Sequence, residues 1–275
     1  MFLRSLKLLI SVLVYCIDQF EMQFLKIFGY KISPRHIVLY YHAVKKEQRE
    51  RFARQMDEIL RLAKPFSAVD RYPDTTGNHH VAVTFDDGLA SFLRYALPEL
   101  RKRDMPFTMF VPTGYLGQSP GWIKKESGQN ISERVMNEDE LRELSTYGIA
   151  SIGSHCVTHR NLATLSDEEA RDEMVRSKAD LERILGKEVK TLSFPHGSFQ
   201  STHVECAKQA GYVRVFSIKP APAFEIEHEF VTGRTHCDPD DWLQELRLKC
   251  LGGYRWMRSA SRIKNLLRKT FRRSV

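Results

Sequence analysis

Strand-like and helical stretches alternate along most of this chain, and that alternation limits its fold more than any other sequence feature. Between residues 37 and 236, runs rich in β-branched and aromatic residues recur between longer segments with helical periodicity. The seven predicted strands cover residues 37–44, 80–85, 107–112, 147–153, 189–194, 212–218 and 230–235. Such alternation favours a parallel sheet, and seven repeats in about 200 residues suit a barrel at least as well as an open doubly wound sheet.

Helices are predicted over residues 47–63, 90–103 and 166–185. A capping box supports two helix starts, because Ser166 is followed by Glu169 and Asn137 by Glu140. No glycine-rich phosphate-binding motif is present, which weakens nucleotide-binding versions of this fold class. The five cysteines show no C-x-x-C spacing, so neither a full disulfide framework nor a thiolate zinc site is expected, and a reducing compartment is favoured.

The net charge of +8 comes from the C-terminal end of the chain. Residues 253–275 hold eight basic residues and no acidic one, so the rest of the chain is neutral. Apolar residues recur at helical spacing within this segment, which predicts a basic amphipathic helix or tail. We interpret it as a contact with an anionic membrane surface rather than with nucleic acid, and a helix packed on the barrel or a solvated tail is the alternative.

Residues 8–17, near the N-terminus, form an apolar run that follows Arg4 and Lys7. Ten residues are too few for a helix to cross a bilayer of roughly 30 Å. No small-x-small cleavage site follows, so an uncleaved interfacial segment is expected over residues 1–36, with a signal peptide or a packed helix as alternatives. The chain is expected in the cytoplasm or on the inner face of a bacterial cytoplasmic membrane, with export as the alternative, and its barrel domain is expected over residues 37–252.

Polar residues gather where three of the predicted strands end. Residues 86–88 read Asp-Asp-Gly, residues 154–159 read Ser-His-Cys-Val-Thr-His, and residues 195–197 read Pro-His-Gly. The carboxyl ends of parallel strands lie at one edge, so these side chains are expected on one rim. Adjacent carboxylates need a cation or a base role, and two histidines with one Asp supply the ligands of a catalytic zinc. Each motif alone is also typical of a turn or a helix cap, and their occurrence together favours a site.

These motifs resemble those of a known family. Residues 84–88 match the T-F-D-D-G motif of the polysaccharide deacetylases, whose domain is also called the NodB-homology domain, and residues 154–159 match their S-H-x-x-T-H motif. The resemblance covers roughly residues 37–245. It implies a distorted (β/α)7 barrel that removes N-acetyl groups from amino sugars with a divalent metal, usually Zn²⁺. Asp86 would then be the general base, and Asp87, His155 and His159 the metal ligands.

The third family motif, R-x-P-x-G, is matched only in part by residues 193–197. Ser193 replaces the arginine that would orient the base. The backbone N–H of His196 remains available as an oxyanion donor, a role that can be worth about 3 kcal/mol. Arg234 ends the last predicted strand and is a candidate for orienting Asp86, although it could equally be an ordinary surface or pairing residue.

The two late motifs of the family are weaker. Residues 238–242 fit D-x-x-D-W, but Asp238 followed by Pro239 is also typical of a helix start, and we favour a helix cap. The family's L-x-H, which supplies the general acid, has no match near the C-terminus. His236 is the best substitute, and His42, at the end of the first predicted strand, is the alternative.

The sequence therefore predicts a metal-dependent hydrolase that removes N-acetyl groups from amino sugars of a polysaccharide or of a lipid-linked saccharide. Such an enzyme would act in cell-envelope or exopolysaccharide biosynthesis. A deformylase or other amidase acting on a lipid-linked amino sugar would use the same residues. A metal-free carbohydrate-binding relic is the alternative outside the enzymes, because two family residues are missing.

Overall fold

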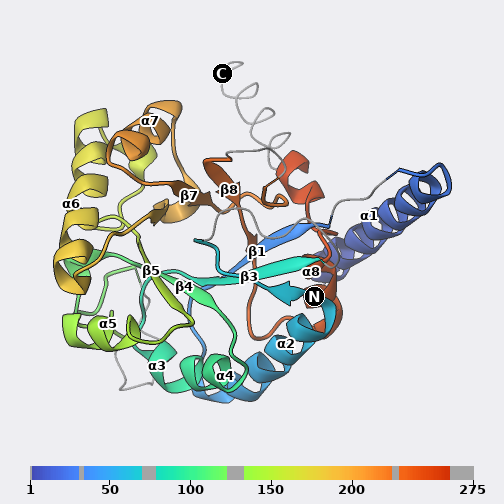
Figure 1. Cartoon of the computed structure of the whole chain (residues 1–275), viewed down its shortest axis with the longest axis horizontal. Helices are drawn as coiled ribbons and strands as arrows, with labels where there is room; N and C mark the ends of the chain where they lie inside the picture. The colour runs from blue at the N-terminus through green and yellow to red at the C-terminus, as the bar shows by residue number, and fades with distance from the viewer. Residues whose placement is uncertain (1, 31–33, 70–78, 123–132, 225–228, 261–275) are drawn as a thin grey trace.

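Parallel strands form a nearly closed barrel at the centre of the molecule, and helices cover its outside (Figure 1). The structure is a computed structural model, and it describes residues 2–30, 34–69, 79–122, 133–224 and 229–260. The barrel strands are β1 (His36–Tyr41), β3 (His80–Phe85), β4 (Phe107–Val111), β5 (Ala150–Ser154), β6 (Thr191–Ser193), β7 (Arg214–Ser217), β8 (Val231–Gly233) and β9 (Thr235–His236). A two-residue strand, β2 (Lys64–Pro65), pairs with β3. The (β/α) barrel implied by the family resemblance is confirmed, and the open doubly wound sheet that the alternation also allowed is excluded.

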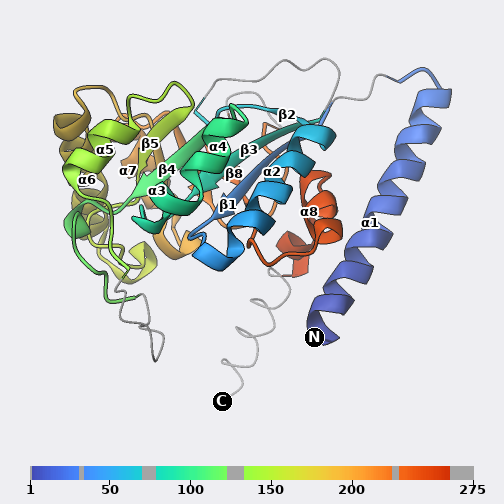
Figure 2. The same ribbon diagram turned by 90° about the horizontal axis from the view of Figure 1, so that it is seen from below.

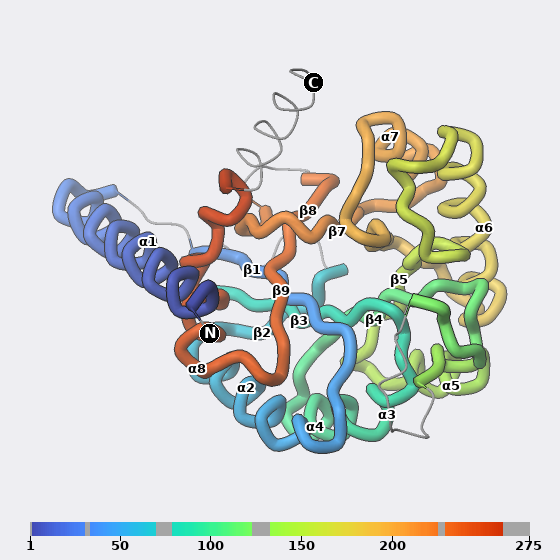
Figure 3. The backbone as a smooth tube through the Cα atoms, turned by 180° about the vertical axis from the view of Figure 1, so that it is seen from behind, coloured from blue at the N-terminus to red at the C-terminus, as the bar shows by residue number. Residues whose placement is uncertain are grey.

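The strand order is β8-β7-β6-β5-β4-β3-β1-β9, and every ladder between these strands is parallel. β8 and β9 stand at opposite ends of this order, yet only Arg234 separates them along the chain. Figure 3 shows this segment beside both β7 and β1. The last predicted strand is therefore two short strands, and the residue between them closes the barrel.

The helices that cover the strands follow them in chain order. They are α2 (Arg49–Leu62), α3 (Ser91–Tyr95), α4 (Leu97–Lys102), α5 (Glu138–Leu144), α6 (Asp167–Leu185), α7 (Ser201–Gln209) and α8 (Leu243–Cys250). Both predicted capping boxes are confirmed: the side chains of Asn137 and Ser166 accept from the backbone N–H three residues on. The single helix predicted over residues 90–103 is wrong in one respect, because it breaks at Ala96, just before Pro98.

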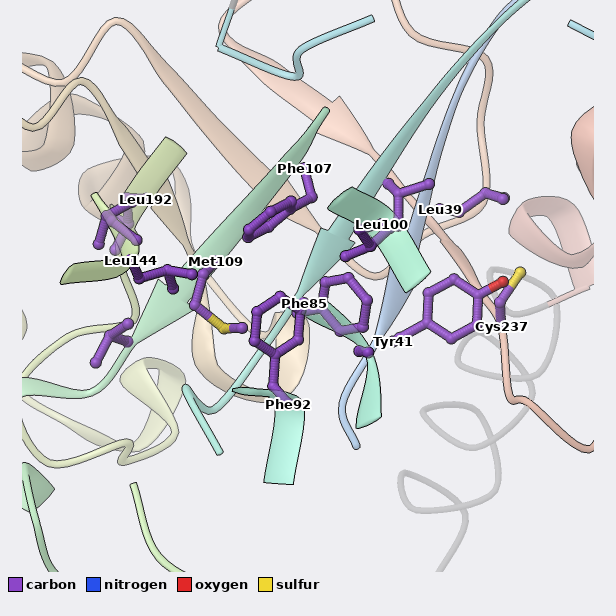
Figure 4. Close-up of a cluster of buried hydrophobic side chains, with 14 of the residues drawn as sticks. Leu39, Tyr41, Phe85, Phe92, Leu100, Phe107, Met109, Leu144, Leu192 and Cys237 are labelled. Atoms are coloured by element: carbon purple, nitrogen blue, oxygen red, sulfur yellow. The ribbon is translucent and has the colours of Figure 1, made fainter. Parts of the chain in front are cut away.

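The hydrophobic core lies in two places, because strand residues alternate between the two faces of the barrel wall. Tyr41 and Phe85 point outward and pack with Phe92 and Leu100 from the covering helices (Figure 4). A smaller cluster that includes Phe110 and Phe216 fills the inside of the barrel. The five cysteines are all free. The wall is thus packed on both faces.

The N-terminal segment forms one long helix, α1 (Phe2–Ile27), which lies beside α8 (Figure 2). At 1.5 Å per residue its 26 residues extend about 39 Å. By length and composition it could cross a membrane, so the prediction that the segment is too short to do so is wrong. The reason is that the helix extends beyond residues 8–17 at both ends, and apolar residues recur along it from Phe2 to Ile27. A signal or an anchor passes the same test.

Two further expectations concern the C-terminal part. The predicted helix cap at Asp238 is wrong, because α8 begins only at Leu243. Residues 238–241 instead form a turn in which the Asp238 carboxylate accepts from the N–H of Asp240 and the Asp241 carboxylate accepts from the N–H of Asp238, each at 2.8 Å. Residues 256–260 are helical, and the rest of the basic amphipathic helix predicted for residues 253–275 lies outside the described residues.

Candidate metal and catalytic site

Three turns at the carboxyl ends of β3, β5 and β6 carry the polar residues singled out in the sequence. Asp87, Cys156, His159 and His196 in these turns have φ values of 70°, 63°, 55° and 57°. Left-handed backbone costs a residue with a side chain about 1 kcal/mol or more, and such residues often cluster where a site needs them. The turns place their side chains over the mouth of the barrel.

Asp87, His155 and His159 form a buried cluster whose candidate ligand atoms all lie within 4.8 Å of one another. Oδ1 of Asp87 lies 3.2 Å from Nε2 of His159 and 3.7 Å from Nε2 of His155. Among the described residues this buried Oδ1 has no hydrogen-bond partner. An unpaired buried carboxylate oxygen facing two imidazole nitrogens fits the ligand set of a divalent metal.

The ring of His155 is held in one orientation. Its Nδ1 lies 2.7 Å from the carbonyl oxygen of Ser193, so Nδ1–H donates and Nε2 keeps its lone pair toward Asp87. Burial lowers the pKa of His155 to about 4, which keeps the ring neutral near neutral pH. Burial by itself would raise the pKa of Asp87, but the neighbouring imidazoles of His159, His155 and His42 outweigh it and hold the pKa below its usual range.

Trp122 covers the cluster from one side. Its indole stacks on the His159 ring with centroids 4.1 Å apart, and Tyr115 packs against it. The ring of His196, whose side chain is exposed, lies 4.8 Å from that of His159. Trp122 could not be predicted from the sequence, because it lies in the part of the connection between β4 and α5 that has no strand or helix pattern.

Asp86 is paired with Arg234. The guanidinium donates to both carboxylate oxygens, at 2.7 and 2.8 Å, and neither side chain is more than 4% exposed. It also donates to Oγ1 of Thr84 at 3.0 Å and to Oγ of Ser193 at 2.7 Å. Burial would raise the pKa of Asp86, but the charges of Arg234 and His155 outweigh it and hold the pKa well below its usual range. Asp86 is therefore an oriented carboxylate.

Ser193 leaves the space that this arginine needs. An arginine at position 193, as in the family motif, would reach the carboxylate from β6, whereas Arg234 reaches it from the junction of β8 and β9. The guanidinium lies against the rings of Tyr40, Phe110 and Phe216, 4.7, 5.3 and 5.7 Å from their centroids. Aromatic faces attract a cation, so this environment suits a buried arginine.

His42 and His236 lie together at the same rim. Their rings are 6.0 Å apart, and the His236 ring lies 5.1 Å from that of Tyr40. The charge of His42 contributes to the lowered pKa of both Asp86 and Asp87. Both imidazoles are exposed, so both can meet a substrate at the rim.

The D-x-x-D-W segment does not join the site. Asp241 pairs with Lys249, and the Trp242 ring packs under the guanidinium of Arg4 at 4.3 Å. These contacts attach residues 241–242 to α8 and α1.

The fold and the cluster define a class: parallel (β/α) barrels with an Asp-His-His group at the carboxyl ends of the strands. Within this class, the family model for polysaccharide deacetylases matches residues 73–215, and the chain belongs to that family. The comparisons thus confirm the resemblance first seen in the strand-end motifs.

Curated relatives and solved structures agree with this assignment. A peptidoglycan-N-acetylglucosamine deacetylase of Bacillus cereus is 27% identical over 156 residues, which are 55% of this chain and 50% of the relative. A poly-β-1,6-N-acetyl-D-glucosamine N-deacetylase of Staphylococcus aureus is 24% identical over 147 residues, 50% of this chain and 48% of the relative. The chain spans about half the length of these relatives. The structure of IcaB from Ammonifex degensii superposes with a TM-score of 0.64 at 23% identity, covering 79% of this chain and 97% of that one, which supports the fold.

Proposed function

We propose that this chain is a metal-dependent hydrolase that removes N-acetyl groups from amino sugars of an envelope polysaccharide, an exopolysaccharide or a lipid-linked precursor. One observation carries the proposal: adjacent carboxylates have different surroundings. Asp86 is held by Arg234, while Asp87 faces His155 and His159. Two carboxylates in different environments are typical of sites that divide two roles between them. The names of the relatives, which are deacetylases of N-acetylglucosamine polymers, support the substrate class.

Asp87, His155 and His159 would hold the metal, which we propose to be Zn²⁺. Two nitrogens and one oxygen leave a coordination position open, as catalytic zinc sites do. The bound metal would polarise the acetyl carbonyl and make a nearby water more acidic. The hydrogen bond from His155 to the Ser193 carbonyl fixes the ligand ring before any metal arrives.

Asp86 would accept the proton of the attacking water. Each of its oxygens already accepts one hydrogen bond from Arg234, and each keeps a further lone pair. Arg234 keeps the carboxylate ionised and oriented, so it acts as a positioning residue. Because the pKa of Asp86 is lowered, the carboxylate is ionised at neutral pH and can accept a proton.

Two further groups complete the proposed reaction. The backbone N–H of His196, in the rim turn after β6, would donate to the oxyanion that forms on the acetyl carbonyl. The leaving amine needs a proton, and His236 and His42 are the histidines placed to give it. His236 is the proposed acid and His42 the alternative, and the two rings lie 6.0 Å apart at the rim.

The proposal is tested by measuring acetate release and bound zinc on the same samples. Purified protein is incubated with poly-β-1,6-N-acetylglucosamine and with N-acetylated peptidoglycan strands. Asp86→Asn should lower turnover at least about 100-fold and keep the metal, whereas His155→Ala should lose the metal as well. Asp139→Asn, at an exposed position on α5, is the control and should match the wild type.

Each alternative gives a different result in this experiment. A fully active Asp86→Asn protein would remove Asp86 from the mechanism. Formate in place of acetate would identify a deformylase. A protein that binds the glycan, does not bind zinc and does not turn over the substrate would be a carbohydrate-binding relic.

A further inference from the structure

The helix α1 presents two different faces. Arg4, Ser11 and Asp18 follow one another at intervals of seven residues, which places them on one stripe of an α-helix. This stripe faces the barrel, since Ser11 and Asp18 are 0% and 1% exposed. The polar residues of α1 on this side are therefore turned toward protein and not toward solvent.

Each of the three stripe residues is bonded to the barrel. The Arg4 guanidinium donates to both carboxylate oxygens of Glu245 and to the Asp240 carbonyl at 2.9 Å. The Trp256 indole N–H donates to Oγ of Ser11 at 2.9 Å. The Asp18 carboxylate accepts hydrogen bonds from Arg35, at 2.8 Å, and from Arg255. We call these contacts the clamp, and it joins α1 to α8, to the start of β1 and to residues 255–256.

The opposite face of α1 is apolar along its whole length. Eight large side chains recur at spacings of three and four, and each is between 42% and 80% exposed. This outer stripe consists of Phe2, Leu6, Leu9, Leu13, Ile17, Phe20, Phe24 and Ile27. None of the eight is charged, and at 100° per residue Lys7, Glu21 and Lys26 lie outside this stripe. A continuous apolar strip of this length on an exposed helix requires a partner.

We propose that α1 lies flat in the interface of an anionic lipid bilayer, with the outer stripe among the acyl chains and the barrel in water. A helix with one apolar and one polar side adopts this position. The basic residues support an anionic surface: Arg255 and Trp256 of the clamp begin the segment of residues 253–275, which holds eight basic residues and no acid. Each basic residue near such a surface contributes about 1 kcal/mol.

The clamp argues against a spanning helix. It extends from Arg4 to Asp18, about 21 Å along the helix at 1.5 Å per residue. A hydrocarbon core is about 30 Å thick, so a spanning α1 would draw α8 and its charged residues into the lipid. Release of the clamp would instead leave Asp18 unpaired near the bilayer centre, at a cost of about 2.5 to 3.5 kcal/mol.

The clamp also sets how the barrel would stand on the bilayer. Arg4 contacts Asp240, just beyond the carboxyl end of β9, whereas Asp18 contacts Arg35, which precedes β1. The helix thus runs antiparallel to the strands along the barrel wall (Figure 2). The barrel axis would lie along the bilayer, and the rim that carries Asp86 would open sideways over its surface. The membrane contact itself does not rest on the proposed hydrolysis.

Vesicle flotation tests the membrane contact. Full-length protein is mixed with vesicles of phosphatidylglycerol and phosphatidylcholine, and separately with phosphatidylcholine alone. We expect the protein to float with the anionic vesicles, and Leu13→Glu combined with Phe20→Glu should lower the bound fraction at least about tenfold. Leu60→Glu, an exposed apolar position on α2, is the matched control and should float like the wild type. Unchanged circular dichroism and thermal melting of the double variant show that it is folded.

A labelling experiment separates a flat helix from a spanning one. Lys7→Cys and Lys26→Cys are made in a Cys16→Ser background, bound to sealed vesicles and treated with a maleimide that cannot cross lipid. Both ends should be labelled equally from outside. Labelling of one end alone overturns the proposal. So does wild-type protein that does not bind anionic vesicles. The proposal is also overturned if the membrane-bound protein is found to have lost residues 1–30 by cleavage. It is overturned as well if the wild type binds no vesicles but forms a dimer without lipid, and the double variant does not form that dimer.

Discussion

At the scale of single residues, Asp86 and Arg234 form a buried ion pair inside the barrel. Both side chains are buried, and the guanidinium has carboxylate, hydroxyl and aromatic partners on its sides. Removing one member of a buried ion pair leaves a charge without compensation, which costs about 3 to 5 kcal/mol. The pair therefore affects folding as well as the proposed chemistry, and tests of Arg234 have to separate the two.

A double-mutant cycle measures the part of this contact that concerns folding. One nitrogen of Arg234 donates to both Asp86 and Ser193, so a guanidinium attached at position 193 would lie close to the same place. Arg234→Ser and Ser193→Arg should each lower the free energy of unfolding by about 3 kcal/mol or more. The double variant should lose about 1 to 3 kcal/mol less free energy of unfolding than the sum of the losses of the two single variants. Urea denaturation measures this, and strictly additive losses would contradict the exchange of roles between the two positions.

The residues of the site differ in how visible they are in the sequence. Asp87, His155 and His159 follow predicted strands directly, so the rule that strand ends share a rim brings them together. Arg234 is predicted to approach Asp86 only because it ends a strand. Trp122 could not be found, since its contact with His159 depends on the path of a connection that has no periodic pattern. Contacts between residues that are far apart in the sequence are therefore the part of the site that could not be predicted.

At the scale of elements, long and strongly patterned segments are predicted well, and short ones are not. α6 was expected to within one residue, because its capping box and periodicity agree. The separation of β8 from β9 was missed, since strands of three and two residues carry no alternation of their own. The start of α8 was also missed, because side chains of Asp238 and Asp241 close a turn where a cap was expected.

The starts of β1 and β3 give a prediction about pH. The rings of His36 and His80 stack there with centroids 5.0 Å apart, beside Phe66 and Phe224. Burial, together with the charge of His80, lowers the pKa of His36 to about 4. Between pH 6.5 and 4 the unfolded chain therefore binds a proton that the folded chain does not, so stability falls as the pH falls through this window.

The measurement compares urea denaturation of the wild type and of His36→Phe at pH 7 and pH 5. Because solvent at the end of the barrel screens part of the effect, we expect His36 to account for about 1 kcal/mol of the wild-type loss. His36→Phe should lose less stability by that amount. His196→Phe, at an exposed position, should behave like the wild type. The same loss in His36→Phe as in the wild type would remove His36 as its cause.

At the scale of the whole molecule, the alternation of strands and helices predicts a parallel sheet covered by helices, because each repeat must bury both sides of its strand. It does not predict how the barrel closes. Closure depends on one segment whose first part pairs with β7 and whose last part pairs with β1, with Arg234 between them. The Arg234 side chain contacts residues inside the barrel. The closure of the barrel between β8 and β9 and the orientation of Asp86 therefore depend on the same side chain.

Metal binding should raise the stability of the whole folded protein. A ligand that binds only the folded state stabilises it, by about 2.7 kcal/mol when its concentration is 100 times the dissociation constant. For a chain of this length that corresponds to a rise in melting temperature of roughly 5 to 10 °C. Calorimetry with and without added zinc should show this rise for the wild type and for Asp86→Asn, whose Asp87, His155 and His159 are intact. His159→Ala should show little or none, and an undiminished rise in His159→Ala would mean that zinc binds elsewhere.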